Sequence, residues 1–257
     1  MRQPSALYKR HRFPGEIISH AVWRYYRVLL SYRDVEELLA ERGIAASYET
    51  VRRWCKKFGQ PFADRLRRRR ARPGDKWHND EVQLKINGCK HWLWRAVDQD
   101  GVVLDILVQA RRNQEAAEAF LRRLLNGSGY APRVIVTDKL ASYPPAVRRV
   151  LPGVEHRRHK GLNNRAENSH RPTRRRERVL QRFKSPEHAQ QFLSPFGPIS
   201  KHFRPRRHLL PALEYHVLLQ TRFVQWRERT GLAAAEQAVG WCQHASAQQS
   251  PSPSPFT

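Results

Sequence analysis

Three acidic residues, Asp80, Asp138 and Glu167, stand in sequence contexts that suggest one metal-binding site. Asp80 falls inside a predicted strand, where β-propensity disfavours aspartate, and Asp138 ends the β-branched segment VIVT. Carboxylate oxygens suit Mg²⁺ or Mn²⁺, which keep open positions for water and phosphate oxygens. Two such ions about 4 Å apart activate a water or a 3′-hydroxyl for in-line displacement at phosphorus. The three acids therefore indicate phosphodiester chemistry.

The elements that must position Asp80 and Asp138 are strands. Residues 77–109 predict three strands joined by an Asn87-Gly88 turn and by a second turn at 98–101. Asn113 is expected to cap a helix that ends at 126–127, before the strand that ends at Asp138. A strand-helix-strand order favours parallel pairing through a right-handed crossover, which would bring Asp138 beside Asp80.

A basic segment surrounds Glu167. After an expected short helix (143–150) and short strand (154–156), residues 162–183 show helical spacing that Pro172 should disturb. On such a helix one carboxylate heads a row of guanidiniums that return to nearly the same angle: Glu167, Arg171, Arg174 and Arg178. Ion pairing within a solvated helix face is the alternative explanation.

The N-terminal part predicts a helix-turn-helix. After a packing helix, Ser31 caps one helix that Gly43 ends, and Ser47 starts a second short helix. The second helix is expected to turn a polar face to DNA, made of Tyr48, Arg52, Arg53, Lys56 and Lys57. Any hairpin of two helices with a solvated cationic face is the alternative.

The arginine-rich run 65–72 and Pro73-Gly74 mark a predicted domain boundary. We expect a DNA-binding region at 1–72, a catalytic domain at 73–231 and a flexible tail rich in Ser, Pro and Gln at 232–257. Within the run, the residues expected to lie on DNA phosphates are Arg67, Arg68, Arg69 and Arg70.

Composition points to a polyanionic partner. The 257 residues carry 48 Lys and Arg against 23 Asp and Glu, a formal charge of +25, so double-stranded DNA is the first candidate. No apolar run reaches the roughly 20 residues of a membrane span, and no signal peptide is evident. The three dispersed cysteines fit reduced thiols, so a cytoplasmic, nucleoid-associated protein is expected.

Several motifs, in order, resemble the Asp-Asp-Glu transposases of bacterial insertion sequences, specifically insertion-sequence family six. They are SYETVRRWCKKFG, WHNDEV, NGCKHWLWRAVDQDG, VTDKLASY and EHRRHKGLNNRAENSHRPTRRRER. The resemblance implies an RNase H-like α/β core, a mixed five-stranded sheet flanked by helices, after an all-α helix-turn-helix domain. The aspartate-to-glutamate gap of 28 residues is shorter than the wider family leads us to expect, so a shortened loop is implied between Ser142 and Leu162.

The resemblance also implies residue roles. Asp80, Asp138 and Glu167 become the ligands of two Mg²⁺ ions, with Mn²⁺ as a substitute, and Arg174 takes the place of a basic residue seven positions past the glutamate. Basic residues expected to contact DNA beside the metals are Lys139, His170, Arg171, Arg174, Arg175 and Arg178. The implied partners are terminal inverted repeats, target DNA and a second copy of the chain, in a homodimer or higher oligomer.

Other interpretations stay open at this stage. Glu81 should point to the sheet face opposite Asp80, in a structural role. A catalytically inactive DNA-binding regulator would not need the three acids, whereas an RNase H-like nuclease could use the same metal site. A tyrosine recombinase is disfavoured because no histidine has an arginine three residues later.

Overall fold

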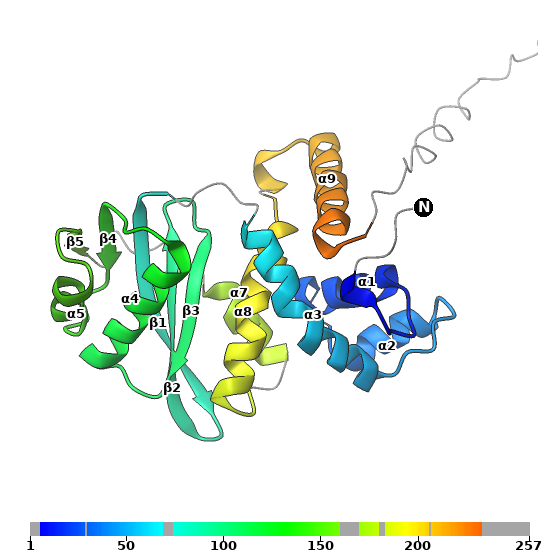
Figure 1. Cartoon of the computed structure of the whole chain (residues 1–257), viewed down its shortest axis with the longest axis horizontal. Helices are drawn as coiled ribbons and strands as arrows, with labels where there is room; N and C mark the ends of the chain where they lie inside the picture. Colours follow the sequence, from blue (N-terminus) through cyan, green and yellow to red (C-terminus); the bar gives the residue numbers. More distant parts are fainter. Residues whose placement is uncertain are drawn as a thin grey trace, which may run out of the picture.

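The computed structural model describes residues 6–28, 30–68, 74–159, 170–179, 183–205 and 207–232. A mixed sheet forms one end of the molecule and a bundle of helices forms the other (Figure 1). The strands are β1 (Lys76–Ile86), β2 (Cys89–Asp98), β3 (Val103–Gln109), β4 (Val134–Thr137) and β5 (Glu155–Arg158). The helices are α1 (Gly15–Arg27), α2 (Tyr32–Ala40), α3 (Tyr48–Arg68), α4 (Gln114–Ser128), α5 (Tyr143–Val150), α7 (Arg171–Val179), α8 (Pro186–His202) and α9 (Ala212–Thr230).

The sheet has the order β3-β2-β1-β4-β5. The first three strands form an antiparallel meander, while β4 pairs parallel to β1 and β5 pairs parallel to β4. This confirms the predicted mixed five-stranded sheet flanked by helices. The parallel crossover through α4 puts β4 beside β1, although five strands cannot be ordered from periodicity alone.

The Asn87-Gly88 turn fixes the register of β1 against β2. Both residues have positive φ, 48° and 82°, as a two-residue hairpin of the primed type requires. Ile86 therefore pairs with Cys89, and the same register places Asp80 opposite Arg95.

One face of the sheet is covered by α4 and α5 (Figure 1). Trp77, Trp94 and Ile135 of the sheet are fully buried in one core with Phe120 and Tyr143 of the two helices. The Asn113 side chain caps α4 by accepting a hydrogen bond from the Ala116 N–H at 3.0 Å, as expected. The predicted end at 126–127 was wrong by two residues, because the left-handed cap falls at Gly129, with φ 71°.

The other face carries α8, which lies between the sheet and the N-terminal helices (Figure 1). Leu84 and Leu93 share a core with Phe58 of α3 and with Phe192 and Phe196 of α8. Helix α3 packs along α8, so one continuous core joins the N-terminal helices to the sheet. Among the described residues, no helix has the length and apolar character to cross a membrane.

The N-terminal helices start as the sequence predicts but extend further. Ser31 and Asp34 form a reciprocal capping box at the start of α2, and the Ser47 hydroxyl accepts a hydrogen bond from the Thr50 N–H. The expectation of a second short helix was wrong: α3 has 21 residues and includes Pro61. Gly59 allows α1 to approach there, since a Cβ would lie 2.7 Å from the Tyr26 hydroxyl.

Candidate active site

Asp80 and Asp138 meet where two neighbouring parallel strands end their pairing. His78 of β1 pairs with Val136 of β4, so the residues two positions further on lie side by side. Asp80, Glu81 and Asp138 each offer a carboxylate oxygen, and these oxygens lie within 4.8 Å of one another. The strand-helix-strand order predicted the Asp80–Asp138 pair, whereas Glu81 was expected on the opposite sheet face in a structural role.

Glu81 is the buried member of the cluster. Its side chain is fully covered, accepts a 2.9 Å hydrogen bond from the Tyr143 hydroxyl, and pairs with Arg112. Burial and the negative charge of Asp138 raise the pKa of the Glu81 carboxyl, while hydrogen bonds from Arg112 and Tyr143 oppose that rise. Glu81 does face the α5 side, as the sequence predicted, and Arg112 links it to the aspartate pair.

Arg112 bridges the two carboxylates of Glu81 and Asp138. Its Nη2 lies 3.5 Å from Asp138 Oδ2, and its guanidinium stacks 4.7 Å from the ring centre of Trp92. The second oxygen of Asp138 accepts a 2.9 Å hydrogen bond from the Leu140 N–H. These contacts hold Asp138 in a fixed orientation at the end of β4. Sequence analysis missed Arg112, which lies in the β3–α4 connection and gave no local signal.

Asp80 faces the opposite side of the sheet, toward α7. Arg95, its cross-strand neighbour, is 4% exposed and donates a hydrogen bond to the Thr173 hydroxyl on α7. Burial lowers the pKa of Arg95 to about 10, and the charge of Asp80 opposes that fall. The guanidinium remains charged at neutral pH and stabilises the Asp80 carboxylate.

His170 covers Asp80 from the start of α7. Its Nε2 lies 3.5 Å from Asp80 Oδ2, and the residue is 4% exposed. Burial, followed by the positive charges of Arg95 and Arg174, lowers the pKa of His170 well below its usual range. The ring is therefore neutral near pH 7, and its contact with Asp80 is not an ion pair.

Helix α7 divides its arginines between two faces. Arg174, Arg175 and Arg178 are exposed, whereas Arg176 is fully buried. Lys139, one residue past Asp138, is also exposed. Three predicted site residues, Glu167, Arg69 and Arg70, lie outside the described residues, as does the side chain of Arg171. Glu167 therefore stays a prediction as the third metal ligand.

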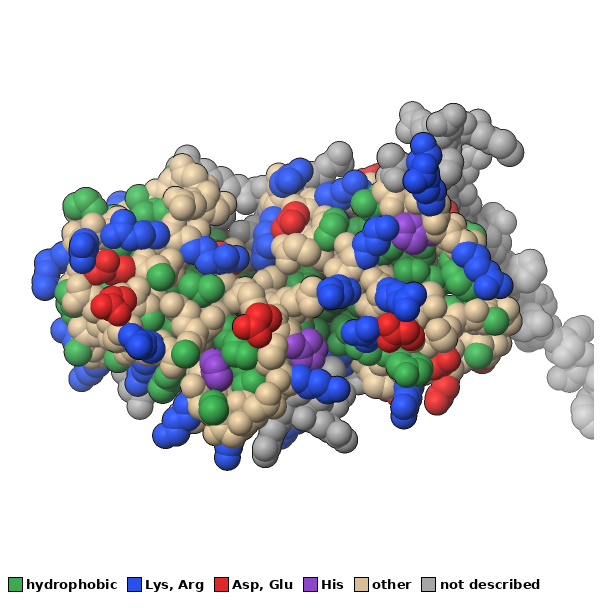
Figure 2. All heavy atoms as spheres, turned by 60° about the horizontal axis from the view of Figure 1, so that its bottom comes forward, with side chains coloured by type: hydrophobic (Ala, Val, Ile, Leu, Met, Phe, Trp, Pro, Cys, Tyr) green, Lys and Arg blue, Asp and Glu red, His purple; other side chains and the backbone are tan. Residues whose placement is uncertain are grey.

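The predicted DNA-facing residues of α3 lie on one exposed surface, at Tyr48, Arg52, Arg53, Lys56 and Lys57. Glu49 accepts hydrogen bonds from Arg52 and Arg53. Arg68 is also exposed, but the side chain of Arg67 is only 25% exposed and binds Asp64 and the Ser194 carbonyl. On the face shown in Figure 2, Lys and Arg side chains are scattered over both the sheet and the helical part, with fewer acidic side chains among them.

The donor set fits a hard divalent cation. Carboxylate oxygens from two adjacent strands converge in a protein of charge +25, and arginines lie against them as counter-charges. Oxygen-only donors of this kind select Mg²⁺ or Mn²⁺ over softer metals. An aspartate pair on a mixed sheet, with basic surface around it, fits the class of metal-dependent polynucleotidyl transferases.

Comparison with known proteins agrees with that class. A family model described as a DDE domain, of the IS240 transposase type, matches residues 74–206. The transposase for the insertion sequence-like element IS431mec of Staphylococcus aureus is 33% identical over 169 residues, 64% of this chain and 75% of the relative. The transposase for insertion sequence element IS257 in transposon Tn4003, also from Staphylococcus aureus, is 32% identical with the same coverage.

The chain belongs to the DDE transposases of insertion-sequence family IS6. The reaction of that family is metal-dependent DNA cleavage and strand transfer, and the five-stranded sheet of this chain carries the acidic pair. Among solved structures, the catalytic core domain of HTLV-2 integrase in complex with magnesium aligns over 51% of this chain and 85% of that chain. The sequence identity is 17% and the TM-score is 0.36.

Proposed function

We propose that this transposase binds the terminal inverted repeats of its own element, cuts there, and joins the resulting 3′-hydroxyls to target DNA. The observation that carries the proposal is the Asp80–Asp138 pair, whose oxygens converge between β1 and β4. Joining two ends in one event needs two active sites, so we propose a homodimer or higher oligomer on DNA, acting at the nucleoid in the cytoplasm.

Asp80, Asp138 and Glu167 are the proposed ligands of two Mg²⁺ ions, and Mn²⁺ is expected to substitute. When bound, the metal supplies Lewis-acid polarisation of the phosphate and a reactive oxygen nucleophile at neutral pH. The remaining work falls to side chains of the chain itself. Arg112 lies 3.5 Å from Asp138 and Arg95 faces Asp80 across the strands, so the two guanidiniums orient the aspartates and compensate their charge, as supporting groups around a metal site do.

The exposed arginines of α7 are the proposed clamp on the DNA backbone beside the acids. Arg174, Arg175 and Arg178 project from α7, and His170, the residue before that helix, lies 3.5 Å from Asp80. Guanidiniums bind phosphates with two parallel hydrogen bonds, which restrains the strand as well as attracting it. The polar surface of α3, from Tyr48 to Lys57, is proposed to read the terminal repeat.

The decisive experiment is strand transfer on labelled element-end DNA in Mg²⁺ or Mn²⁺. Asp80→Asn, Asp138→Asn and Glu167→Gln should each retain DNA binding and lose joining by at least 100-fold. Glu115→Gln, a change in the first turn of α4, is the matched control and should join normally. Two outcomes would redirect the proposal. Binding without cutting or joining by the intact protein points to a regulator, and cutting without joining points to a nuclease.

A further inference from the structure

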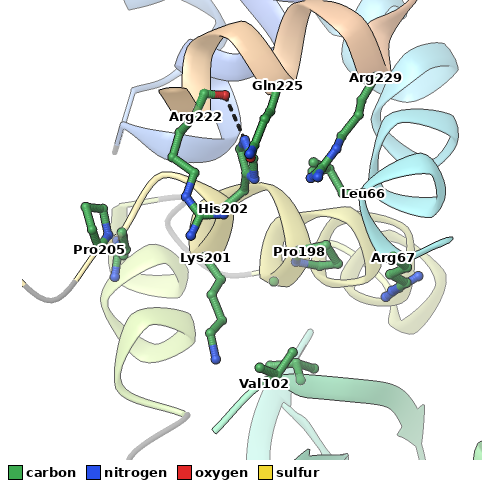
Figure 3. Close-up of a pocket in the computed structure, with 13 residues that line it drawn as sticks. Leu66, Arg67, Val102, Pro198, Lys201, His202, Pro205, Arg222, Gln225 and Arg229 are labelled. Carbon is green, nitrogen blue, oxygen red and sulfur yellow. Dashed lines mark hydrogen bonds between the residues drawn. The ribbon is translucent and has the colours of Figure 1, made fainter. Parts of the chain in front are cut away.

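A cavity of about 400 Å³ lies on the helical side of the sheet, where α3, α8 and α9 meet above the β2–β3 turn (Figure 3). Arg222, Gln225 and Arg229 reach into it from α9, and Arg67 reaches in from α3. The floor includes Val102 and Val103. None of its lining residues belongs to the Asp80–Asp138 cluster, so the cavity is a separate site.

The lining of this cavity is strongly cationic. Its charged residues are Arg67, Lys201, Arg204, Arg222 and Arg229, and the described lining includes no aspartate or glutamate. Like charges gathered in so small a space repel one another, and an anion in the cavity would relieve that repulsion. Asp64 and the Ser194 carbonyl, outside the cavity, already hold Arg67.

The walls also contain buried polar atoms that an anionic ligand could satisfy. In the described part of the chain, the buried Nε of Arg222 has no hydrogen-bond acceptor. The backbone of Arg222 is held separately, because its carbonyl lies 2.9 Å from His202 Nε2 (Figure 3). The guanidinium is thus left available to the cavity, and an unsatisfied buried donor costs roughly 1–3 kcal/mol.

A basic path joins the cavity to the catalytic side of the molecule. The positive charges of Arg27 and Arg175 contribute to lowering the pKa of Arg204, after burial, so these guanidiniums lie close to the rim. Arg175 belongs to the exposed face of α7, and His170, the residue before that helix, lies 3.5 Å from Asp80. A polyanion bound to the exposed face of α7 is therefore also within the electrostatic reach of Arg204.

We propose that this cavity binds the phosphate backbone of a DNA strand that continues past the catalytic aspartates. Arginine forks match phosphate oxygens geometrically, and a volume of about 400 Å³ exceeds one phosphate and accommodates a nucleotide unit. The inference rests on the proposed function, since it takes the bound DNA to be the substrate of strand transfer. It assigns α8 and α9 to DNA binding, beyond the α3 surface and α7.

The first test measures affinity for element-end DNA at several salt concentrations without divalent metal, which removes chemistry from the readout. Arg204→Gln with Arg222→Gln should weaken binding roughly tenfold at 0.15 M salt and reduce the slope of log K against log salt by about 2. Arg122→Gln changes an exposed arginine on α4 outside the cavity and is the matched control. It should leave the affinity at 0.15 M salt unchanged and alter the slope by less than about half a unit. An unchanged slope in a folded double variant overturns the proposal.

The second test uses the unaltered protein, so a misfolded variant cannot obscure the result. Arginine-specific chemical modification is mapped by mass spectrometry with DNA, with inorganic phosphate or with a mononucleotide. DNA should reduce modification of Arg204 and Arg222 at least fivefold and leave Arg122 reactive. Protection by phosphate or the nucleotide but not by DNA overturns the DNA assignment. Failure of the proposed function would instead appear as normal binding and protection without strand transfer.

Discussion

Asp80 and Arg95 face each other across β1 and β2, and Arg95 extends the contact to Thr173 of α7. One buried guanidinium therefore compensates the charge of the first aspartate and ties the sheet to the basic helix. Burying Asp80 beside an apolar partner would be costly, because an isolated carboxylate loses its hydration without compensation. The pair explains how an aspartate persists inside a strand.

Replacing Arg95 by Gln should reduce strand transfer roughly 10–100-fold while element-end binding stays intact. The glutamine keeps polar atoms near Thr173 but removes the positive charge that compensates the Asp80 carboxylate. The measurement is strand transfer beside gel-shift binding with the same DNA. Arg123→Gln, which removes the pairing of an exposed arginine with Asp105, is the control and should be fully active. Normal transfer by the Arg95 variant would contradict the role given to it.

Tyr143→Phe should lower the free energy of unfolding by about 1–3 kcal/mol, because one oxygen of the fully buried Glu81 loses its hydroxyl donor. Urea unfolding followed by tryptophan fluorescence gives the number. Tyr48→Phe, at a residue 43% exposed, removes the same hydroxyl where water replaces it, and its effect should stay under about 0.5 kcal/mol. Equal effects of the two changes would show that the Glu81 contact adds nothing.

Arg176→Met should destabilise the fold by about 3 kcal/mol. The guanidinium is fully buried, donates to the carbonyls of Tyr25 and Leu30, and lies over the Tyr25 and Phe192 rings. Arg174→Met, two residues earlier, is the control; its side chain is 46% exposed, so stability should change by less than about 0.5 kcal/mol. Thermal or urea unfolding distinguishes the two variants. If Arg176→Met left the free energy of unfolding unchanged, Arg176 would not anchor α7.

Stability should fall as the pH drops from 6.5 toward 4, in part through His202. Burial lowers the pKa of His202 in the folded protein to about 4, so the unfolded chain binds the proton first. Neutral His202 therefore contributes up to about 3 kcal/mol to the free energy of unfolding above pH 6.5, and this contribution is lost as the pH falls from 6.5 to 4. His202→Asn should flatten the pH dependence by that amount relative to the parent protein. Parallel curves for the two proteins would contradict it.

The sequence predicted the elements and the Asp80–Asp138 pair because both depend on local signals. Turn residues at Asn87-Gly88 define the hairpin, and a helix between two strands favours the parallel crossover. Counting outward from that turn also pairs Asp80 with Arg95, so this contact was within reach of sequence analysis.

The contacts around Glu81 and the full length of α3 could not be predicted, because both depend on tertiary packing. Arg112 and Tyr143 reach Glu81 from connections and helices that no local pattern orients toward it. The sequence predicted a short second helix, yet packing of Phe58 and Phe62 against α1, α8 and α9 carries α3 through Pro61 to Arg68. The predicted domain boundary near residue 73 lies in a stretch outside the described residues and stays a prediction.

Helix α3 is, mechanically, a rod of about 30 Å, given its 21 residues. Its first turns present the polar surface at Tyr48, and its far half is embedded with Phe62 and Leu66 in the core shared with α8 and the sheet. Moving the exposed end of α3 relative to β1 would break the packing of Phe62 and Leu66. The distance between the polar surface of α3 and the Asp80 carboxylate is therefore fixed by this packing. For a DNA bound to that surface, the distance along the DNA decides which phosphodiester bond lies at Asp80 and Asp138.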